Sequence, residues 1–370
     1  MEVVRGLGMG GAENLLVSRL KCALGGGFIS AEQVRIVNTN GRADHFENAI
    51  RSLGVRVITT KSSNAAQSSF EIARHVMSAK AGTIWVSHSP MASLPAKAVN
   101  AVFPVKANLI DVAHTTHYKT PLLLAGKGLN RYAAKCLAVS EAVAGSPAVR
   151  GYSNVVVVRP GIDLDRVRHL LRAPVGGVGA LRDQIGVSSE GGRLVCAVGS
   201  LNRLKGHHLL VEALAEPGLG DFHLIILGEG PERESIECLA RALNIEDRVH
   251  LLGICTDPLP WIAASDVMVH PSEYEGLSLA LIEARSLGVP VIATEVGGIP
   301  EALRGYGRRL FLDERSARGI ASKILEIDRD LGPFLSEVGG RPEPSDTWSI
   351  EMSTIAFYKS LGLDTRAWDI

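Results

Sequence analysis

The sequence predicts an α/β protein built from two doubly wound domains, each with a parallel sheet between layers of helices. Short apolar runs alternate with helical patterns along the chain, which is the order that parallel sheets produce. The chain has 370 residues, a length that fits two domains of roughly 150–200 residues each. Its 46% hydrophobic and 21% charged residues are sufficient for two ordinary cores.

The expected strands fall into two groups separated by a linker. Residues 163–190 show no strand pattern and include a stretch rich in Gly, so we expect the linker there. We therefore expect domains at 1–165 and 166–345, followed by a C-terminal helix at about 349–361 within residues 346–370. The expected strands lie near 2–5, 34–38, 55–59, 83–87, 105–113, 136–139 and 154–158, and then near 193–198, 223–227, 249–252, 267–270, 289–293 and 309–312.

Composition excludes several classes of protein. The formal net charge of +0 argues against a nucleic-acid binder. The 5 cysteines are scattered and form no CxxC pair, which indicates reduced thiols in a cytoplasmic protein, without a disulfide framework or a zinc site. We expect no signal peptide, and no apolar run approaches the ~20 residues of a membrane helix.

A pair of acidic residues is the most informative local feature. Glu275 and Glu283 flank the apolar segment that follows the strand expected at 267–270, so Glu275 should lie in the strand-to-helix loop and Glu283 in the helix. The helix N-terminus between them suits an anion. Two acids on either side of a diphosphate can bind a sugar hydroxyl and ribose hydroxyls. Taken alone, two solvated glutamates would be the more ordinary interpretation.

Two basic residues upstream favour a ligand site over two solvated glutamates. Arg203 and Lys205 follow the strand expected at 193–198, and both side chains suit phosphate oxygens. Open α/β sheets bind ligands at the carboxyl ends of their strands, where this loop lies. Gly-rich turns at 227–233 and 297–301 follow two further strands, although turn chemistry alone explains each of them.

The first loop matches the dinucleotide pattern GxGxxG between Gly6 and Gly11. That fingerprint needs an acid at the end of the second strand, but the chain has Asn38 and Asn40 there and no acid before Asp44. We therefore disfavour NAD binding and expect a Gly loop that faces donor phosphates or the acceptor. The preceding strand is short, so we expect that the chain begins a few residues late.

Histidines at strand ends are further candidates. His114 and His117 follow the strand expected at 105–113, and the spacing HxxH invites a metal interpretation. No third ligand accompanies them, whereas zinc sites need three or four ligands. His88 follows the neighbouring expected strand and faces the same edge, where it could contact an acceptor. We assign His207, His208, His250 and His270 to structural roles.

Five motifs together resemble the retaining glycosyltransferases of family 4, which have the GT-B fold. The residues are the loop 199–206, the Ex7E pair Glu275 and Glu283, the GGxPE segment 297–301, the segment 159–163 and the GGAE segment 10–13. The segment 159–163 begins Arg-Pro where the family usually has Pro-Asn. The resemblance implies two Rossmann-like domains that face across a cleft, the first for the acceptor and the second for the nucleotide-sugar donor. It also implies that the last helix returns to the first domain.

The resemblance also implies residue roles. It assigns Arg203 and Lys205 to the diphosphate, Glu275 to the donor sugar and Glu283 to the ribose. His114 becomes the histidine that contacts the donor sugar, with His117 as the alternative. The expected catalytic residues are thus Arg203, Lys205, Glu275 and His114, and the expected donor-binding residues are Gly11, Gly199, Arg203, Lys205, Glu275, Gly276, Leu277, Ser278, Leu279 and Glu283.

The expected reaction moves a sugar from a UDP-sugar or GDP-sugar to an acceptor hydroxyl with retention of configuration, without a metal or other cofactor. The acceptor would be a glycan, a lipid-linked sugar or a small molecule in surface polysaccharide or lipopolysaccharide assembly, with peripheral contact at the cytoplasmic membrane face. Two alternatives stay open. One is another GT-B enzyme of nucleotide sugars, such as a UDP-N-acetylglucosamine epimerase, and the other is a non-catalytic nucleotide-sugar binder.

Overall fold

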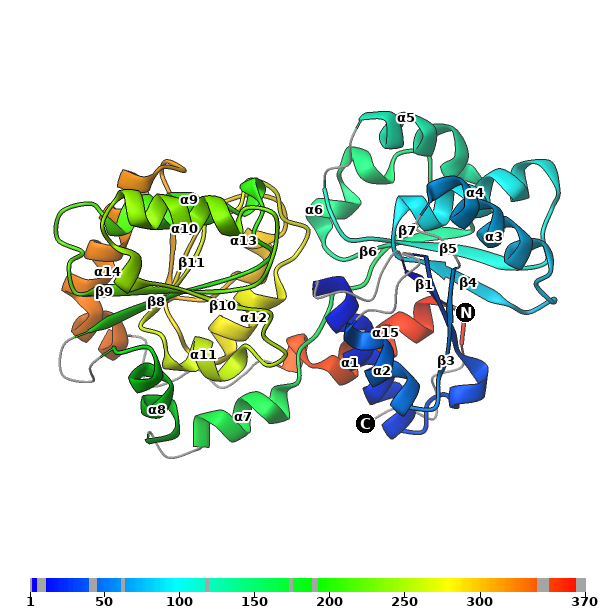
Figure 1. Ribbon diagram of the computed structural model, residues 1–370. Coiled ribbons are helices and arrows are strands. Elements are labelled where there is room, and N and C mark those ends of the chain that lie inside the picture. The colour runs from blue at the N-terminus through cyan, green and yellow to red at the C-terminus, as the bar shows by residue number, and fades with distance from the viewer. Residues whose placement is uncertain are drawn as a thin grey trace. The chain divides into compact units, whose positions relative to one another are not determined.

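The computed structural model describes residues 2–4, 11–39, 45–60, 64–116, 120–172, 176–187, 192–337 and 346–363. The chain forms two compact units. Unit 1 comprises Met1–Ile162 together with Thr347–Ile370, and unit 2 comprises Asp163–Asp346. Figure 1 shows a sheet in each unit with helices on both of its faces.

Unit 1 contains a seven-stranded parallel sheet in the order β3-β2-β1-β4-β5-β6-β7. Its strands are β1 (Glu2–Val4), β2 (Arg35–Asn38), β3 (Arg56–Thr59), β4 (Ile84–Ser87), β5 (Asn108–Ala113), β6 (Lys135–Ala138) and β7 (Val155–Val157). Its helices are α1 (Gly11–Gly25), α2 (His45–Ser52), α3 (Ala65–Met77), α4 (Pro90–Val102), α5 (Thr120–Leu129), α6 (Glu141–Ala144) and α15 (Ile350–Ser360), with short 3₁₀ turns η1 (Ala31–Gln33), η2 (Asn130–Tyr132) and η3 (Pro147–Val149).

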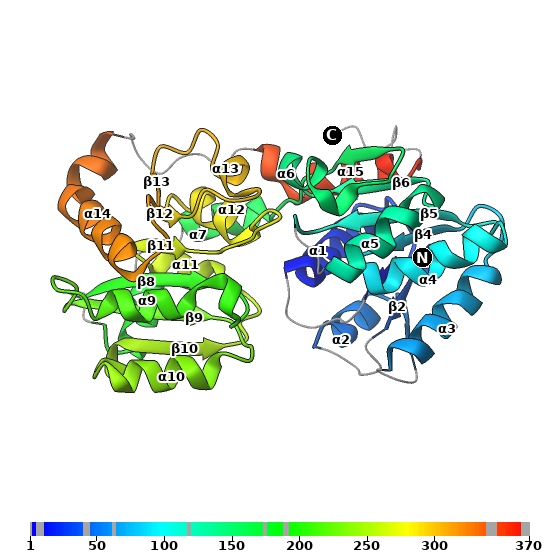
Figure 2. The same ribbon diagram turned by 90° about the horizontal axis from the view of Figure 1, so that it is seen from above.

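Helices α1, α2 and α15 cover one face of this sheet, and α3, α4 and α5 cover the other (Figures 1 and 2). The two layers bury separate apolar clusters. Leu16, Leu20 and Ile36 belong to the first cluster, and Ile72 and Trp85 belong to the second. Strands buried on both faces read as continuous apolar runs, which explains why their positions follow from the sequence.

The C-terminal helix α15 packs on α1 within unit 1. The Arg19 guanidinium lies 3.8 Å from the centre of the Phe357 ring. The chain enters this helix beside the segment 159–163. The Ile162 N–H donates to the Trp348 carbonyl oxygen, and the Ile162 carbonyl oxygen accepts from the Ile350 N–H. A Cβ atom on Gly161 would lie 2.1 Å from the Ser349 carbonyl oxygen, so glycine is required at this position of the motif.

Unit 2 contains a six-stranded parallel sheet in the order β10-β9-β8-β11-β12-β13. Its strands are β8 (Arg193–Val198), β9 (Phe222–Leu227), β10 (Val249–Gly253), β11 (Val267–His270), β12 (Val291–Ala293) and β13 (Arg309–Phe311). Its helices are α7 (Leu164–Arg172), α8 (Gly176–Gln184), α9 (His207–Leu214), α10 (Arg233–Ala242), α11 (Leu259–Ala264), α12 (Leu279–Ser286), α13 (Ile299–Ala302) and α14 (Ala317–Glu337), with η4 (Arg203–Lys205) and η5 (Glu246–Arg248). The turn η6 (Asp346–Trp348) lies at the unit boundary.

The expected linker at 163–190 is wrong as a description of this segment, because α7 and α8 occupy most of it. The Asp163 side chain accepts a hydrogen bond from the Arg166 N–H and so caps α7. Leu164 and Val167 are buried on one side of this helix. The Arg182 guanidinium of α8 donates to Asp266, next to β11. Both helices are therefore part of the packing of unit 2.

One strand boundary also differs from the expectation. The strand expected at 105–113 begins at Asn108, because the Asn100 side chain accepts a hydrogen bond from the Val105 N–H and holds that residue in the turn after α4. The other expected strands are present to within a few residues. Within the described part of the chain, no helix is long and apolar enough to cross a membrane.

Candidate active site

Two loops at the carboxyl edge of the unit 2 sheet bring the predicted site residues together. The loop after β8 carries Arg203 and Lys205 in the turn η4. The loop after β11 carries Glu275 and leads to Ser278, where α12 begins. Strands β8 and β11 are neighbours in the sheet, so their exits lie side by side.

The Glu275 carboxylate is the centre of a compact polar cluster. Its Oε2 atom lies 2.5 Å from the Lys205 Nζ atom and 3.0 Å from the His270 Nε2 atom. The Glu275 and Lys205 side chains are 14% and 22% exposed, so the ion pair is only partly screened by water. The Nε2 atom of His270 also lies 3.1 Å from the Ser272 hydroxyl. His270, for which we expected a structural role, therefore contacts the Glu275 carboxylate.

The electrostatics of this cluster keep Glu275 ionised. Burial alone would raise the pKa of Glu275, but the His270 hydrogen bond and the Lys205 charge outweigh it and hold that pKa at about 2. Burial also lowers the pKa of His270, against the opposing effect of Glu275, so its ring is neutral at pH 7. Glu275 is consequently a fixed hydrogen-bond acceptor and cannot serve as a general acid at neutral pH.

Backbone contacts tie the two loops to each other. The Arg315 side chain donates to the Pro271 carbonyl oxygen at 2.7 Å and to the Leu204 carbonyl oxygen at 3.3 Å. The Glu273 N–H donates to the same Leu204 oxygen at 2.8 Å. Arg315 lies far along the chain, and no local pattern in the sequence marked it as part of this arrangement.

The two glycines of the GGxPE segment allow the Glu275 backbone to approach closely. A Cβ atom on Gly297, where φ is +54°, would lie 1.8 Å from the Glu275 carbonyl oxygen. A Cβ atom on Gly298 would lie 2.0 Å from the Gly276 carbonyl oxygen, and the Gly298 N–H donates to Glu275 at 3.2 Å. This motif therefore shapes the loop that holds Glu275.

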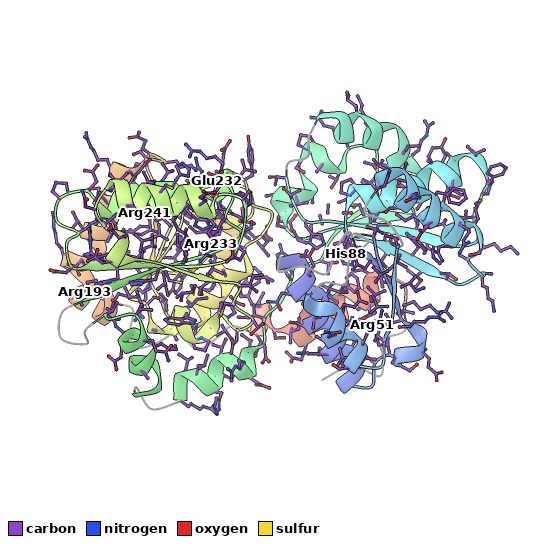
Figure 3. All side chains as sticks on the ribbon, viewed as in Figure 1. Arg51, His88, Arg193, Glu232, Arg233 and Arg241 are labelled. Carbon is purple, nitrogen blue, oxygen red and sulfur yellow. The ribbon has the colours of Figure 1, made fainter. Side chains whose placement is uncertain are left out.

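Glycines also bring the loops after β8 and β9 together. A Cβ atom on Gly228 would lie 2.0 Å from the Gly199 carbonyl oxygen. Glu232 ends the loop after β9 and Arg233 begins α10, and Figure 3 shows both at the opposite end of the sheet from Arg193, where β8 begins. The Glu232 N–H donates to the Leu201 carbonyl oxygen, which connects this loop to the one that carries Lys205.

Glu283 has different surroundings from Glu275. It lies in α12 and is half-buried, and its carboxyl group accepts no hydrogen bond from a described residue. Burial, with a smaller contribution from the Asp257 charge, raises the pKa of Glu283 to about 7. Asp257 itself is 2.5 Å from an Arg166 nitrogen. Glu283 is thus a carboxyl group with unused hydrogen-bonding capacity.

The start of α12 and the Arg203 side chain complete the predicted donor set. Gly276, Leu277 and Ser278 are buried, and the Ser278 side chain makes no capping hydrogen bond with α12. The first N–H groups of the helix, from Leu279 onward, are therefore not capped by that hydroxyl. Arg203 is exposed, and no ion pair joins it to the described residues.

In unit 1, the ends of two neighbouring strands bring two histidines together. His88 follows β4 and His114 follows β5, with the Nδ1 atom of His88 3.0 Å from the Nε2 atom of His114. Their rings are stacked with centroids 5.3 Å apart. Burial, and then the nearby His88 and Arg19, keep the pKa of His114 well below its ordinary value. His88 is labelled in Figure 3.

Other predicted residues of unit 1 are only partly described. Gly11 is the exposed first residue of α1, with open space where a side chain would be. Gly6, Gly10 and His117 lie outside the described residues. The described residues contain no group of three or more His, Cys, Asp or Glu side chains that could hold a metal ion.

A cavity of about 730 Å³ lies elsewhere in unit 1. Its lining includes Val34 and Arg35 at the start of β2, and Thr83 and Ile84 at the start of β4. These are the amino ends of the strands, opposite the edge that carries His88 and His114. The volume of this cavity does not make it the candidate site, because His88 and His114 lie at the other edge of the unit 1 sheet.

Comparison with known proteins places a domain within unit 2. Residues 182–330 match the family described as "Glycosyl transferases group 1". The chain is 30% identical over 178 residues to the N-acetyl-alpha-D-glucosaminyl L-malate synthase of Bacillus anthracis, covering 47% of this chain and 46% of that protein. It is 35% identical over 149 residues to the lipopolysaccharide core biosynthesis glycosyltransferase LpsE of Rhizobium meliloti, covering 40% and 43%. The chain spans about half the length of the curated relatives it matches.

Solved structures resemble the chain over nearly its full length. HepE of Anabaena, solved with UDP and glucose, superposes with a TM-score of 0.79 at 19% identity and 98% coverage of both chains. Sucrose-phosphate synthase of Thermosynechococcus elongatus gives a TM-score of 0.78 at 19% identity, again with 98% coverage of both. These likenesses establish the fold. The chain therefore has the GT-B fold, and its residues 182–330 match the family of group 1 glycosyl transferases.

Proposed function

We propose that this protein is a retaining glycosyltransferase of family 4 that transfers a sugar from a nucleotide-diphosphate sugar to an acceptor hydroxyl. The matched domain, and relatives whose names describe sugar transfer, support the reaction class. The observation that carries the proposal is the cluster of Lys205, His270 and Glu275 beside the start of α12. No cofactor is part of the proposal.

Glu275 would hold hydroxyl groups of the donor sugar. A carboxylate whose pKa is about 2 accepts hydrogen bonds at every working pH. Lys205, His270 and the glycines behind the loop fix its position before the donor arrives. An acceptor that is already oriented loses little free energy to reorganisation when the sugar gains positive charge in the transition state.

The leaving nucleoside diphosphate would be stabilised by positive charge at the same edge. Arg203 is exposed and can form two parallel hydrogen bonds with phosphate oxygens. Lys205 would share its charge between Glu275 and the diphosphate, and the N–H groups at the start of α12 would add a partial positive charge. Glu283 would accept hydrogen bonds from the ribose.

The acceptor is proposed to be a glycan or lipid-linked sugar used in surface polysaccharide or lipopolysaccharide assembly, at the cytoplasmic face of the membrane. A relative named for lipopolysaccharide core biosynthesis supports this class. HepE, solved with UDP and with UDP-glucose, supports a UDP-sugar donor, whereas a relative named as a GDP-mannose-dependent mannosyltransferase supports a GDP-sugar.

The experiment has two stages. A panel of UDP- and GDP-sugars is first screened by thermal shift, since a ligand raises stability by RT ln(1 + [L]/Kd). The donor that stabilises the protein is then incubated with acceptor glycans, and the anomeric configuration of the product is read by NMR. Glu275→Gln should abolish most of the turnover, while Glu273→Gln, at an exposed position two residues earlier, should not.

Three results would contradict the proposal in distinguishable ways. Conversion of a UDP-sugar into its epimer without any acceptor would indicate an epimerase. Donor binding without transfer or hydrolysis across the acceptor panel would indicate a non-catalytic binder. A product with inverted anomeric configuration would exclude the retaining mechanism.

A further inference from the structure

We propose that the outward face of α3 and α4 in unit 1 docks on an anionic lipid bilayer. Lipid docking deepens the proposed function, which places the reaction at a membrane face, but it concerns a different surface and is measured without donor, so either proposal can fail without the other. Helix α4 buries its charged side chain and exposes apolar ones, which is the reverse of the pattern expected for a helix on the surface of a globular protein.

The only charged residue of α4 points inward. Lys97 is 2% exposed, and its Nζ atom donates to Asp111 at 2.8 Å and to Asn130 at 2.7 Å. The exposed residues at the other side and end of the helix are apolar, namely Ala98, Val102 and Phe103. The charge therefore stabilises the interior of unit 1, and the side facing water carries none.

Neighbouring helices extend this apolar face. Helix α4 packs between α3 and α5, and Figure 2 shows the three helices side by side on one face of the sheet. Phe70 and Met77 lie on the exposed side of α3, and Leu124 is exposed on α5. Together with Val102 and Phe103, these side chains are 55–70% exposed, which is unusual for so many large apolar residues on three adjacent helices.

The charges around this face are almost all positive. Arg74, Lys80 and Lys106 are exposed at or just beyond the C-terminal ends of α3 and α4, and Lys127 and Arg131 are exposed at the end of α5. Among residues 64–107 and 120–134, the only acid is Glu71, which is half-buried. The whole chain has a formal net charge of +0, so this excess of positive charge is local.

Apolar side chains among lysines and arginines match the two layers of a bilayer surface. The apolar groups enter the boundary of the acyl chains while the basic groups meet lipid phosphates. A second copy of this chain fits less well, because a two-fold interface would bring two copies of this positively charged face together. We therefore assign the lipid surface, and not a second copy, as the partner.

The test is vesicle flotation of the purified full chain. We expect binding to phosphatidylcholine vesicles that contain phosphatidylglycerol, weaker binding to phosphatidylcholine alone, and weakening by salt. The variant Lys80→Glu with Lys106→Glu should lower the affinity by about fivefold or more for each lysine. The variant Val102→Ser with Phe103→Ser should lower it at least roughly tenfold, because it removes two apolar side chains that insert.

Matched controls use exposed residues of the same type elsewhere. Ile254→Ser changes a residue that is 51% exposed in unit 2, and Lys21→Glu changes an exposed residue of α1 on the other face of the unit 1 sheet. Both should bind vesicles as the wild type does. Failure of the wild type to float with anionic vesicles, or equal losses in the controls, would overturn the proposal. So would a dimer in solution that the Val102→Ser, Phe103→Ser variant dissociates, since the face would then be a protein interface.

Discussion

Replacing Lys205 by Met should destabilise unit 2 and slow the reaction, and the structure gives the size of the first effect. The gap between a Glu275 pKa of about 2 and the ordinary glutamate value of about 4.3 corresponds to roughly 3 kcal/mol of stability at neutral pH. Lys205 and His270 share this stabilisation, so we expect a loss of about 2 kcal/mol when Lys205 is removed. For a domain of this size, that loss lowers Tm by about 4–8 °C.

The pH dependence of that loss has a definite sign. The folded-state pKa of Glu275 is depressed, so the stabilisation is complete above the unfolded-state value of about 4.3 and is lost as the pH falls toward about 2. The Tm difference between wild type and Lys205→Met should therefore be full at pH 7 and narrow below about pH 4. Thermal denaturation followed by circular dichroism across this range measures it.

Arg203→Ala is the matched control. Arg203 is exposed and forms no ion pair with the described residues, so its Tm should stay close to that of the wild type. Both variants should lose on the order of 10²-fold in kcat, because each removes a cation assigned to the leaving diphosphate. An unchanged Tm of Lys205→Met at pH 7, or an equal loss of stability in Arg203→Ala, would contradict a stabilising Lys205–Glu275 ion pair.

Four further outcomes are expected. Glu283→Gln should raise Tm relative to the wild type at pH 8 but not at pH 4, because the wild type loses stability as the pH rises from the unfolded-state pKa of about 4.3 to the folded-state pKa of about 7. A Tm difference independent of pH would count against this. In donor kinetics, Glu275→Gln should mainly lower kcat and Glu283→Gln should mainly raise KM, and calorimetry should show weaker UDP or GDP binding only for Glu283→Gln. Gly297→Ala should lower both Tm and kcat, because its Cβ atom would lie 1.8 Å from the Glu275 carbonyl oxygen. The control Gly305→Ala has a positive φ and open space around it, so it should lower Tm without lowering kcat. Activity should survive dialysis against EDTA, and its loss with recovery on adding Mg²⁺ or Mn²⁺ would reject the metal-independent proposal.

Much of the fold could be predicted from the sequence because the strands are buried on both faces. Residues 194–198 and 267–269 are continuous apolar runs, and the structure has the strands β8 and β11 there. The helices between 163 and 190 were missed for a physical reason. Helix α7 buries only Leu164 and Val167, and the Arg182 guanidinium of α8 donates to Asp266, so the apolar pattern in this segment is short.

The residues of the candidate site that come directly after strands could be predicted from the sequence. Lys205 and Glu275 could both be placed at the carboxyl edge of a parallel sheet because each follows an expected strand, and the structure shows that these strands, β8 and β11, are neighbours. The contact of His270 with Glu275 could have been anticipated, since His270 ends β11 five residues before Glu275. Arg315 could not be found this way, because its hydrogen bonds to Pro271 and Leu204 depend on how distant segments pack.

The two glutamates of the Ex7E pair differ in a way that their spacing does not reveal. Glu275 already has a cation and an imidazole as partners, and its charge is fixed at neutral pH. Glu283 has no donor among the described residues, and its pKa of about 7 leaves it partly protonated. In the proposed complex, hydroxyl donors from a bound ribose would favour the ionised form of Glu283, so we expect nucleotide binding near pH 7 to release protons at this position. Under the proposed function, the protein itself would orient Glu275 for the donor, whereas Glu283 would gain its hydrogen-bond donors only from the bound nucleotide.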